Sequence, residues 1–123
     1  LTQTCDLEQE HVDLVMVCPC WSLSEMEEAS DHFRSKRGKE DIRRGNVPGY
    51  HMLSACDLSG FQREIRVVDF RSVFSLPLSF IKGFALQQSP RLRLLPPYRE
   101  HLAQAFARFF MRVGLPVDIP PFK

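Results

Sequence analysis

Apolar and charged residues alternate most clearly in the middle of the chain, over Glu64–Leu76. Most apolar residues in this stretch are β-branched or aromatic, a pattern typical of a strand with one buried face and one polar face. We expect this strand to continue past a bulge or bend near Asp69–Phe70. Because strand-like segments precede it and a long helix follows it, we interpret it as the centre of the fold.

Further segments have the pattern of strands. Val12–Cys18 is apolar almost throughout, which predicts a central strand buried on both faces. Tyr50–Ala55 alternates and should form a hairpin with Phe61–Phe74. Arg91–Leu95 alternates as well, and Leu1–Asp6 has the pattern of the end of a strand that begins upstream.

A helical insertion is predicted at about 23–46. Ser22 and Glu25 fit a capping box, in which each side chain accepts from the backbone N–H of the other residue. A narrow apolar stripe then predicts a helix from Leu23 to about Lys36, broken at Gly38, with a second short turn after it. Because the second half of this segment is heavily charged, we expect it to be a solvated excursion from the main fold.

The clearest helix is predicted at about 97–113. Pro96 and Pro97 occupy its entry, where a missing backbone N–H costs nothing. Apolar residues line one face at helical spacing and polar residues line the opposite face, so we expect this helix to pack on the sheet. Gly114 is well placed to end it. Together these patterns predict a single α+β domain over residues 1–123, with a small, strongly bent antiparallel sheet.

The composition of the chain limits the classes of function that it can have. The chain of 123 residues is 44% hydrophobic and 25% charged, as in soluble globular domains. Its formal charge of +1 creates no global attraction to nucleic acid, so any basic surface has to be local. No apolar run approaches the roughly 20 residues that span a bilayer, and no signal peptide is recognisable. We therefore expect a cytoplasmic protein without membrane contact.

Two stretches resemble one protein family. Val12–Ser22 (VDLVMVCPCWS) resembles a strand ending in V-x-P-I-T-S, and Ile65–Asp69 (IRVVD), followed by Arg71, resembles the segment I-R-T-I-D. Both occur in this order in the MazF/PemK family of toxin ribonucleases, which are small SH3-like barrels. The resemblance implies an SH3-like barrel with an inserted helix and a C-terminal helix. It also implies toxin–antitoxin function, a homodimer, single-stranded RNA as a partner, and an antitoxin-like protein as another.

The family's catalytic groups are not all present. Its catalytic arginine lies in a G-x-x-R-P strand that would precede Leu1, and its catalytic threonine falls on Trp21, which lacks a hydroxyl group. The resemblance therefore allows two forms of nucleic-acid-associated protein. One is a metal-independent endoribonuclease, completed upstream or rebuilt on His51, Arg66 and Asp69. The other is an inactive descendant.

Arginines and aromatic residues on the predicted strands are candidates for RNA binding. Phosphates could be contacted by Arg66, Arg71, Arg91 and Arg93, and bases could stack on Trp21, Tyr50 and Phe61, the combination that suits single-stranded RNA. The alternative is that these are ordinary solvated arginines, which the near-neutral total charge favours.

The four cysteines form the last candidate site. Cys18 and Cys20 are two apart, so on an extended backbone they share a face. With Cys5 and Cys56 they could form a tetrahedral structural zinc site, which would favour a non-catalytic interaction or dimerisation module. Their spacing matches no standard zinc ribbon or knuckle, and free cysteine is commonly a small buried hydrophobe, in which case no cofactor is expected. Cys5 could alternatively be a nucleophile with His51 as its base.

Overall fold

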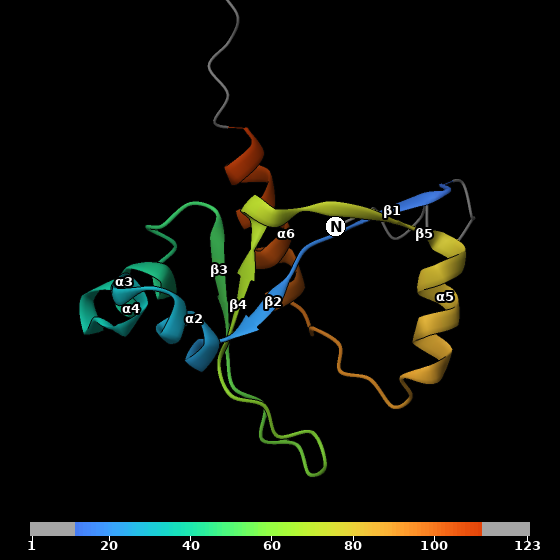
Figure 1. The fold of residues 1–123 in the computed structure, drawn as a ribbon, viewed down its shortest axis with the longest axis horizontal. Helices are drawn as coiled ribbons and strands as arrows, with labels where there is room; N and C mark the ends of the chain where they lie inside the picture. Colours follow the sequence, from blue (N-terminus) through green and yellow to red (C-terminus); the bar gives the residue numbers. More distant parts are fainter. Residues whose placement is uncertain (1–11, 112–123) are drawn as a thin grey trace, which may run out of the picture.

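The computed structural model describes residues 12–111. Its central sheet is flanked by the helical insertion on one side and by an extended ribbon with a helix on the other (Figure 1). In chain order, the elements are β1 (Leu14–Val17), β2 (Cys20–Ser22), α2 (Leu23–Ala29), α3 (Asp31–Arg34), α4 (Lys36–Arg43), β3 (Tyr50–Leu53), β4 (Arg66–Asp69), the 3-10 helix η1 (Phe70–Ser72), β5 (Phe74–Pro77), α5 (Leu78–Gln87) and α6 (Tyr98–Phe110).

The strands form two antiparallel sheets, one of β1 and β5 and one in the order β2-β4-β3. Two stretches of chain run through both sheets: one continues from β1 into β2, and the other from β4 into β5. Val17 pairs with Phe74 in the first sheet, and Cys20 pairs with Val68 in the second. The chain between these pairs is longer on the β4–β5 side, and the surplus residues form η1, where the ribbon bends. The predicted bend near Asp69–Phe70 is confirmed.

The predicted α+β class with small antiparallel sheets is therefore confirmed. The sheets of residues 12–111 do not close into a barrel.

The predicted hairpin is also confirmed. Tyr50 pairs with Asp69 and Leu53 with Arg66, and the ladder continues to an isolated bridge between Cys56 and Arg63. Gly60 turns the chain at the tip with φ = 78°, a conformation in which a side chain would be strained.

The helical insertion is three short helices, so the prediction of one helix from Leu23 to about Lys36 is wrong. The capping box is present, since Ser22 N–H donates to Glu25 Oε2 at 2.7 Å and Glu25 N–H donates to Ser22 Oγ at 3.3 Å. Two further serines restart the helix: Ser30 Oγ accepts from His32 N–H, and Ser35 Oγ accepts from Gly38 N–H. Serine competes for backbone groups in this way and so favours caps over helix interiors.

The prediction that Gly38 breaks the helix is wrong, because Gly38 lies inside α4. A Cβ atom at this position would overlap the backbone carbonyl of His32. Glycine is required here because the first turn of α4 packs directly against α3.

The insertion is not a solvated excursion, and this expectation is wrong too. Met26, Phe33 and Ile42 are buried in one cluster with Val67 of β4, which has no exposed surface. The charged residues alternate with these apolar ones, so the helices α2–α4 cover one face of the three-stranded sheet while their charges face outward.

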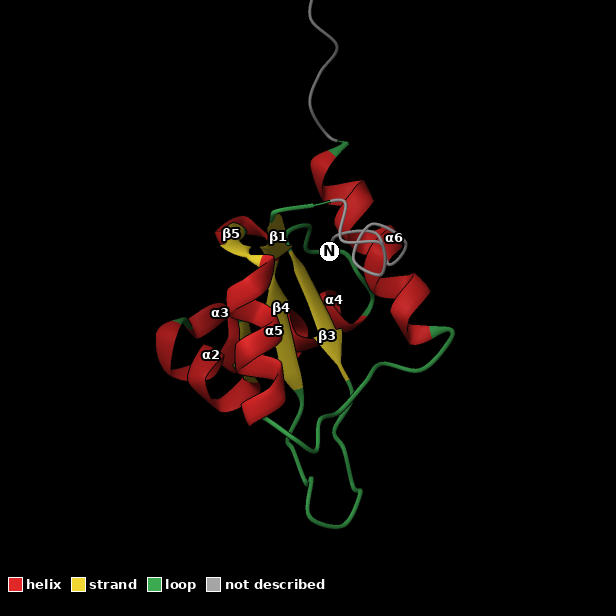
Figure 2. Cartoon of the chain, turned by 90° about the vertical axis from the view of Figure 1, so that its right-hand side faces the viewer, coloured by secondary structure: helices red, strands yellow, loops and turns green. Residues whose placement is uncertain are grey.

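Helix α6 covers the opposite face, as Figure 2 shows. Phe106 and Phe109 contact Phe70, with ring centroids 5.7 Å and 6.3 Å apart, and Phe70 is almost completely buried. The predicted packing of the C-terminal helix on the sheet is confirmed for Tyr98–Phe110. The end of this helix, predicted at residues 112–113, lies outside the described residues, as do Leu1–Asp6 and Gly114.

The β1–β5 ribbon is covered on one face only, since Val15 of β1 is buried. Within the described chain β1 pairs only with β5, and Leu14 is 58% exposed, so the prediction of a central strand buried on both faces is wrong. Helix α5 follows β5 and contacts the ribbon, but none of its residues is buried. The alternating segment Arg91–Leu95 is not a strand, so this prediction is wrong.

Candidate nucleic-acid interface

A cleft of about 510 Å³ opens between the three-stranded sheet and the helices α2 and α3. The sheet side contributes one residue from each of β2, β3, β4 and η1. The helix side contributes mostly small and apolar residues. The lining residues are Trp21, Tyr50, Asp69 and Arg71 on the first side, and Glu25, Met26, Ala29, Ser30 and Phe33 on the second.

Strand register explains why the sheet-side residues meet. Side chains alternate along β4, so Val67 and Asp69 face the helical insertion together. Trp21 pairs with Val67 and Tyr50 pairs with Asp69, and directly paired residues project to the same side of a sheet. The cleft therefore follows from the register of the three strands.

Asp69 holds the Arg71 guanidinium in place. The Asp69 carboxylate is buried, and its Oδ1 atom accepts from the backbone N–H of Arg71 at 3.0 Å and from Arg71 Nε at 3.1 Å. Its Oδ2 atom accepts from the Ser72 hydroxyl at 3.2 Å. The hydrogen bond to Asp69 raises the pKa of Arg71, which stays charged at every relevant pH. The Arg71 side chain is 56% exposed, so this fixed cation remains accessible to a ligand.

Two aromatic rings, those of Tyr50 and Phe33, pack beneath the Arg71 guanidinium, with Tyr50 in direct contact with it. Arg71 Cζ lies 4.3 Å from the centroid of the Tyr50 ring, a cation–π contact, and Phe33 packs edge-on against Tyr50 at 5.1 Å. Gly49 allows this arrangement, because its φ is +95° and a Cβ atom there would lie 3.0 Å from Arg71 Cγ. Burial raises the pKa of the Tyr50 hydroxyl, so that group stays protonated.

Trp21 lies at the rim of the cleft. It is the only tryptophan of the chain and is 43% exposed, which is unusual for a large aromatic side chain on a sheet. Glu25, also on the rim, points its carboxylate at the backbone and hydroxyl of Ser22, and the hydrogen bonds from Ser22 lower its pKa. The cleft thus offers a flat aromatic surface and an oriented guanidinium, with one carboxylate held against its own helix.

The three residues predicted for catalysis do not come together. His51 pairs with Val68, and Arg66 lies two residues before Val68, so both face away from Asp69. The His51 ring stacks on Phe70 on the α6 side, where burial and, second, the charge of His101 lower its pKa. Arg66 Nη1 donates to the Cys20 carbonyl at 3.2 Å. Arg66 and Asp69 are an odd number of residues apart on β4, so their side chains point to opposite faces of the sheet.

The residues predicted for RNA binding are partly brought together. Trp21, Tyr50 and Arg71 line the same cleft, whereas Arg66 does not. Arg91 and Arg93 lie in an exposed coil segment. Met26 and Phe33 complete the cleft. Phe33 and Met26 were part of an apolar stripe in the sequence, which indicates a buried helix face but gives no sign of the sheet face that it meets.

The cysteines do not form a cluster in the described part of the chain. Cys20 pairs with Val68, whereas Cys56 bridges Arg63, which lies five residues before Val68 and nearer the hairpin tip. In residues 12–111 no three His, Cys, Asp or Glu side chains are placed to hold a metal ion. Cys5 lies outside the described residues. Burial raises the pKa of the Cys18 and Cys20 thiols, which disfavours the thiolate that a nucleophile or metal ligand requires.

Searches of protein-family models, curated proteins and solved structures gave no match for this chain. The resemblance to the MazF/PemK family therefore rests on the two sequence stretches alone, and an antitoxin-like partner stays a prediction of that resemblance. No helix within residues 12–111 has both the length and the apolar character needed to cross a bilayer.

Proposed function

We propose that this chain is a nucleic-acid-associated protein that binds single-stranded RNA in the cleft beside Trp21 and Arg71. One observation carries the proposal: an exposed indole and a guanidinium fixed by a buried carboxylate line the same cleft. Stacking of a base on an aromatic side chain contributes about 1–3 kcal/mol, and arginine adds phosphate contacts and cation–π stacking. These are the two interactions that binding to single strands requires.

Each residue has a distinct role in this proposal. Trp21 stacks on a base, and Arg71 donates its outward N–H groups to a phosphate. Asp69 positions Arg71 and does not contact RNA, because its oxygens already accept from Arg71 and Ser72. Tyr50 supports the guanidinium from the floor of the cleft.

The proposal includes an SH3-like ancestry for the fold. The β1–β2 and β4–β5 stretches bend together at η1, as strands do when they pass from one sheet into a second sheet packed against it. This supports a relationship to the MazF/PemK barrels, with the chain as a binding descendant of the group. Cleavage is not part of the proposal, because His51 and Asp69 lie on opposite faces of the sheet and general acid–base chemistry needs both within reach of one substrate.

Quenching of the Trp21 fluorescence tests the proposal directly, since no other tryptophan contributes to the signal. We expect saturable quenching by an oligouridylate of roughly 10 nucleotides, within the site size of small single-strand binders. Arg71→Gln should weaken binding on the order of tenfold. Arg93→Gln, which removes the same charge from an exposed coil position, should not.

Intact Trp21 emission at saturating RNA would overturn binding in this cleft. RNA cleavage that survives a chelator would replace the proposal with the metal-independent endoribonuclease.

A second candidate function, dimerisation, is favoured by helix α5. This helix carries one charged residue, Lys82, and exposes Phe80 and Phe84, whose rings stack on each other. Gly83, between them in sequence, has open space around it, so the backbone of another helix could approach there. Two copies of this face are self-complementary when the helices run antiparallel, as in a two-fold dimer.

Sedimentation analysis over a wide concentration range tests this second candidate. We expect a monomer–dimer equilibrium that Phe84→Glu abolishes and that Arg93→Glu does not affect. A wild-type protein that stays monomeric at the highest concentration would exclude a dimer at this surface.

A further inference from the structure

A second hollow, of about 690 Å³, lies beside α4. Its apolar floor comes from α2, from β3 and from the segment before β4, and its polar wall comes from α4 and its C-terminal cap. The residues are Leu23, Met52 and Ile65 on the floor and Lys36, Arg37, Lys39, Glu40, Arg43 and Arg44 on the wall. We refer to it as the α4 groove.

The α4 groove is the most basic part of the described chain. Between Lys36 and Arg44 there are five cationic and two acidic side chains, whereas the whole chain has a formal charge of only +1. The remainder of the molecule is therefore net negative, and the positive charge is concentrated on one helix. Such a concentration produces a local attraction for polyanions that the total charge conceals.

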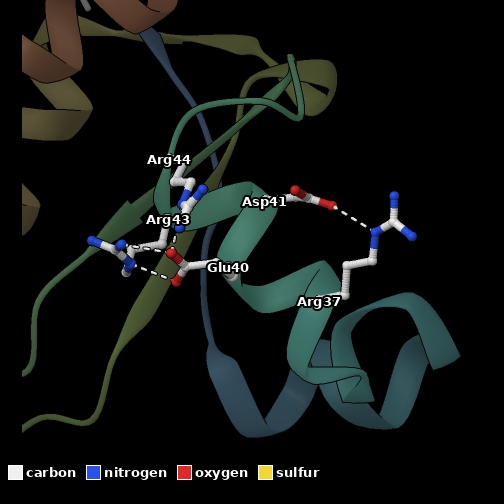
Figure 3. A network of polar contacts seen from close by, with 5 residues as sticks. All are labelled: Arg37, Glu40, Asp41, Arg43 and Arg44. Carbon is white, nitrogen blue, oxygen red and sulfur yellow. Dashed lines mark hydrogen bonds and ion pairs between the residues drawn. The ribbon is translucent and has the colours of Figure 1, made fainter.

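Glu40 arranges two of these cations side by side. Its carboxylate accepts from Arg43 Nε at 2.7 Å, from Arg43 Nη2 at 2.6 Å and from Arg44 Nε at 2.6 Å (Figure 3). The hydrogen bonds from the two arginines lower the pKa of Glu40 to about 2, so the cluster stays ionised throughout the physiological range. Both arginine side chains are more than 60% exposed, and a guanidinium has five N–H donors, so donors remain for a ligand.

The other cations are less engaged. Arg37 approaches Asp41 only to 4.0 Å, with its side chain 95% exposed (Figure 3). Lys39 is paired with Glu27 at 2.7 Å. The long, exposed Arg37–Asp41 pair contributes little, and water or phosphate oxygens can replace the carboxylate in it, whereas Lys39 stays engaged with Glu27.

Packing keeps the basic helix in place. Ile42, in the middle of α4, is 1% exposed and belongs to the core cluster with Val67. The helix is therefore anchored to the sheet by its apolar side, while the arginines next to Ile42 point outward. A rigid platform of this kind loses less conformational entropy on binding than a flexible basic tail does.

From these contacts we infer that the α4 groove binds the phosphate backbone of the same single-stranded RNA, an inference that rests on the proposed function. An occupant of this groove has to supply anions for the neighbouring Arg43 and Arg44, and an unstacked base suits the apolar floor. The two hollows border one structural unit, because Leu23 at the start of α2 lines the groove and Met26 on the same helix lines the cleft.

The test is a salt titration of RNA affinity, using the full chain and a fluorescein-labelled oligouridylate followed by anisotropy. The double variant Arg43→Gln/Arg44→Gln should bind on the order of tenfold more weakly at low salt and reduce the slope of log affinity against log salt by about 1.4, for two single-strand phosphate contacts. The matched control is Arg91→Gln/Arg93→Gln, which removes two exposed arginines from a coil and should change neither value.

The substitution Glu40→Gln provides a second test, in which the expected change is a gain of RNA affinity. The amide oxygen of the variant can still accept from Arg43 and Arg44, but the negative charge that competes with phosphate is gone, so we expect severalfold tighter RNA binding. Unchanged or weaker binding would contradict the inference. Circular dichroism of each variant establishes that α4 is still folded.

The possible results separate this inference from the proposed function. An unchanged affinity and salt slope in the Arg43/Arg44 variant, with Trp21 still quenched, would overturn the inference and leave the cleft proposal intact. Weaker binding and a smaller slope, without Trp21 quenching in the wild type, would support the α4 groove and overturn the cleft. A wild-type protein without RNA affinity would overturn both.

Discussion

The three-stranded sheet and the β1–β5 ribbon are made from the same two stretches of chain, yet the central strand β4 is buried on both faces and β1 on only one, where Val15 is 6% exposed. Val67 and Val68 in β4 are 0% and 3% exposed, whereas Leu14 in β1 and Phe74 in β5 are 58% and 49% exposed. The apolar character of the two halves is similar, so their hydrophobicity does not explain the difference.

Coverage by helices explains it. Helices α2–α4 pack on one face of the sheet, and Phe106 and Phe109 of α6 pack on Phe70 on the other side, whereas the described helix with substantial contacts to the ribbon is α5. An apolar strand of this fold is therefore buried on both faces only where helices reach both of them. This coverage also explains why the cleft is built on the sheet, where buried neighbours fix the positions of Asp69 and Tyr50.

The strongest test of this comparison is a pair of matched truncations. Ile42→Ala, in the covered sheet, should lower the free energy of unfolding by about 2–5 kcal/mol, because it leaves a cavity among Met26, Phe33 and Val67. Leu86→Ala, on α5, should change it by less than about 0.5 kcal/mol, since Leu86 is 82% exposed. Urea denaturation at low protein concentration measures both. Equal effects would show that α5 belongs to the core.

A second test concerns the carboxylate at the centre of the covered sheet. Asp69→Asn should destabilise the protein by about 1–3 kcal/mol, because the buried group loses its charge-assisted hydrogen bonds to Arg71 and the amide offers donors that have no acceptor there. RNA affinity should fall as well, since Arg71 is no longer held over Tyr50. Asp57→Asn, a carboxylate near the exposed hairpin tip, is the control and should leave both values unchanged.

The α6 face of the sheet should make stability depend on pH. The pKa of His51 is lowered in the folded state, so the unfolded chain binds more protons and stability falls as pH drops below 6.5. The lowered pKa of Glu40, at about 2, contributes only at a much lower pH. Thermal melts across this range should show the loss in the wild type and a smaller loss in His51→Leu. Identical slopes would contradict a buried, neutral His51.

The smallest expected effect comes from the exposed ribbon. Met16→Thr in β1 removes a side chain that is 38% exposed, replaces it with a residue that also favours strands, and should leave RNA affinity unchanged. Anisotropy titrations of this variant and of Trp21→Ala, measured side by side, compare the ribbon with the cleft. A weaker binding of the Met16 variant would extend the RNA site onto the ribbon.

Local signals in the sequence were sufficient for several parts of this fold. The capping box at Ser22 and Glu25, the bend after Asp69 and the helix beginning near Pro97 each depend on residues close together in the chain. Counting along β4 is also local, and the odd spacing of Arg66 and Asp69 already places them on opposite faces.

Other parts depended on contacts between distant residues. The apolar run of β1 gives no sign that helices fail to cover it, and the charge around Ile42 conceals that this residue is buried against Val67. The position of His51 relative to Asp69 is set by the register of β3 on β4, and the meeting of Trp21 with Arg71 by the register of β2 on β4. Register depends on turn geometry and packing together, which a single sequence does not reveal.

The most direct measurement of the central claim is photo-crosslinking of the full chain to an oligonucleotide that contains 4-thiouridine, with the modified peptides identified by mass spectrometry. Binding in the cleft predicts that the principal crosslink is to the peptide containing Trp21, and that Arg71→Gln reduces its yield while Arg93→Gln does not. Crosslinks confined to other surfaces, with the Trp21 peptide unmodified, would contradict the account.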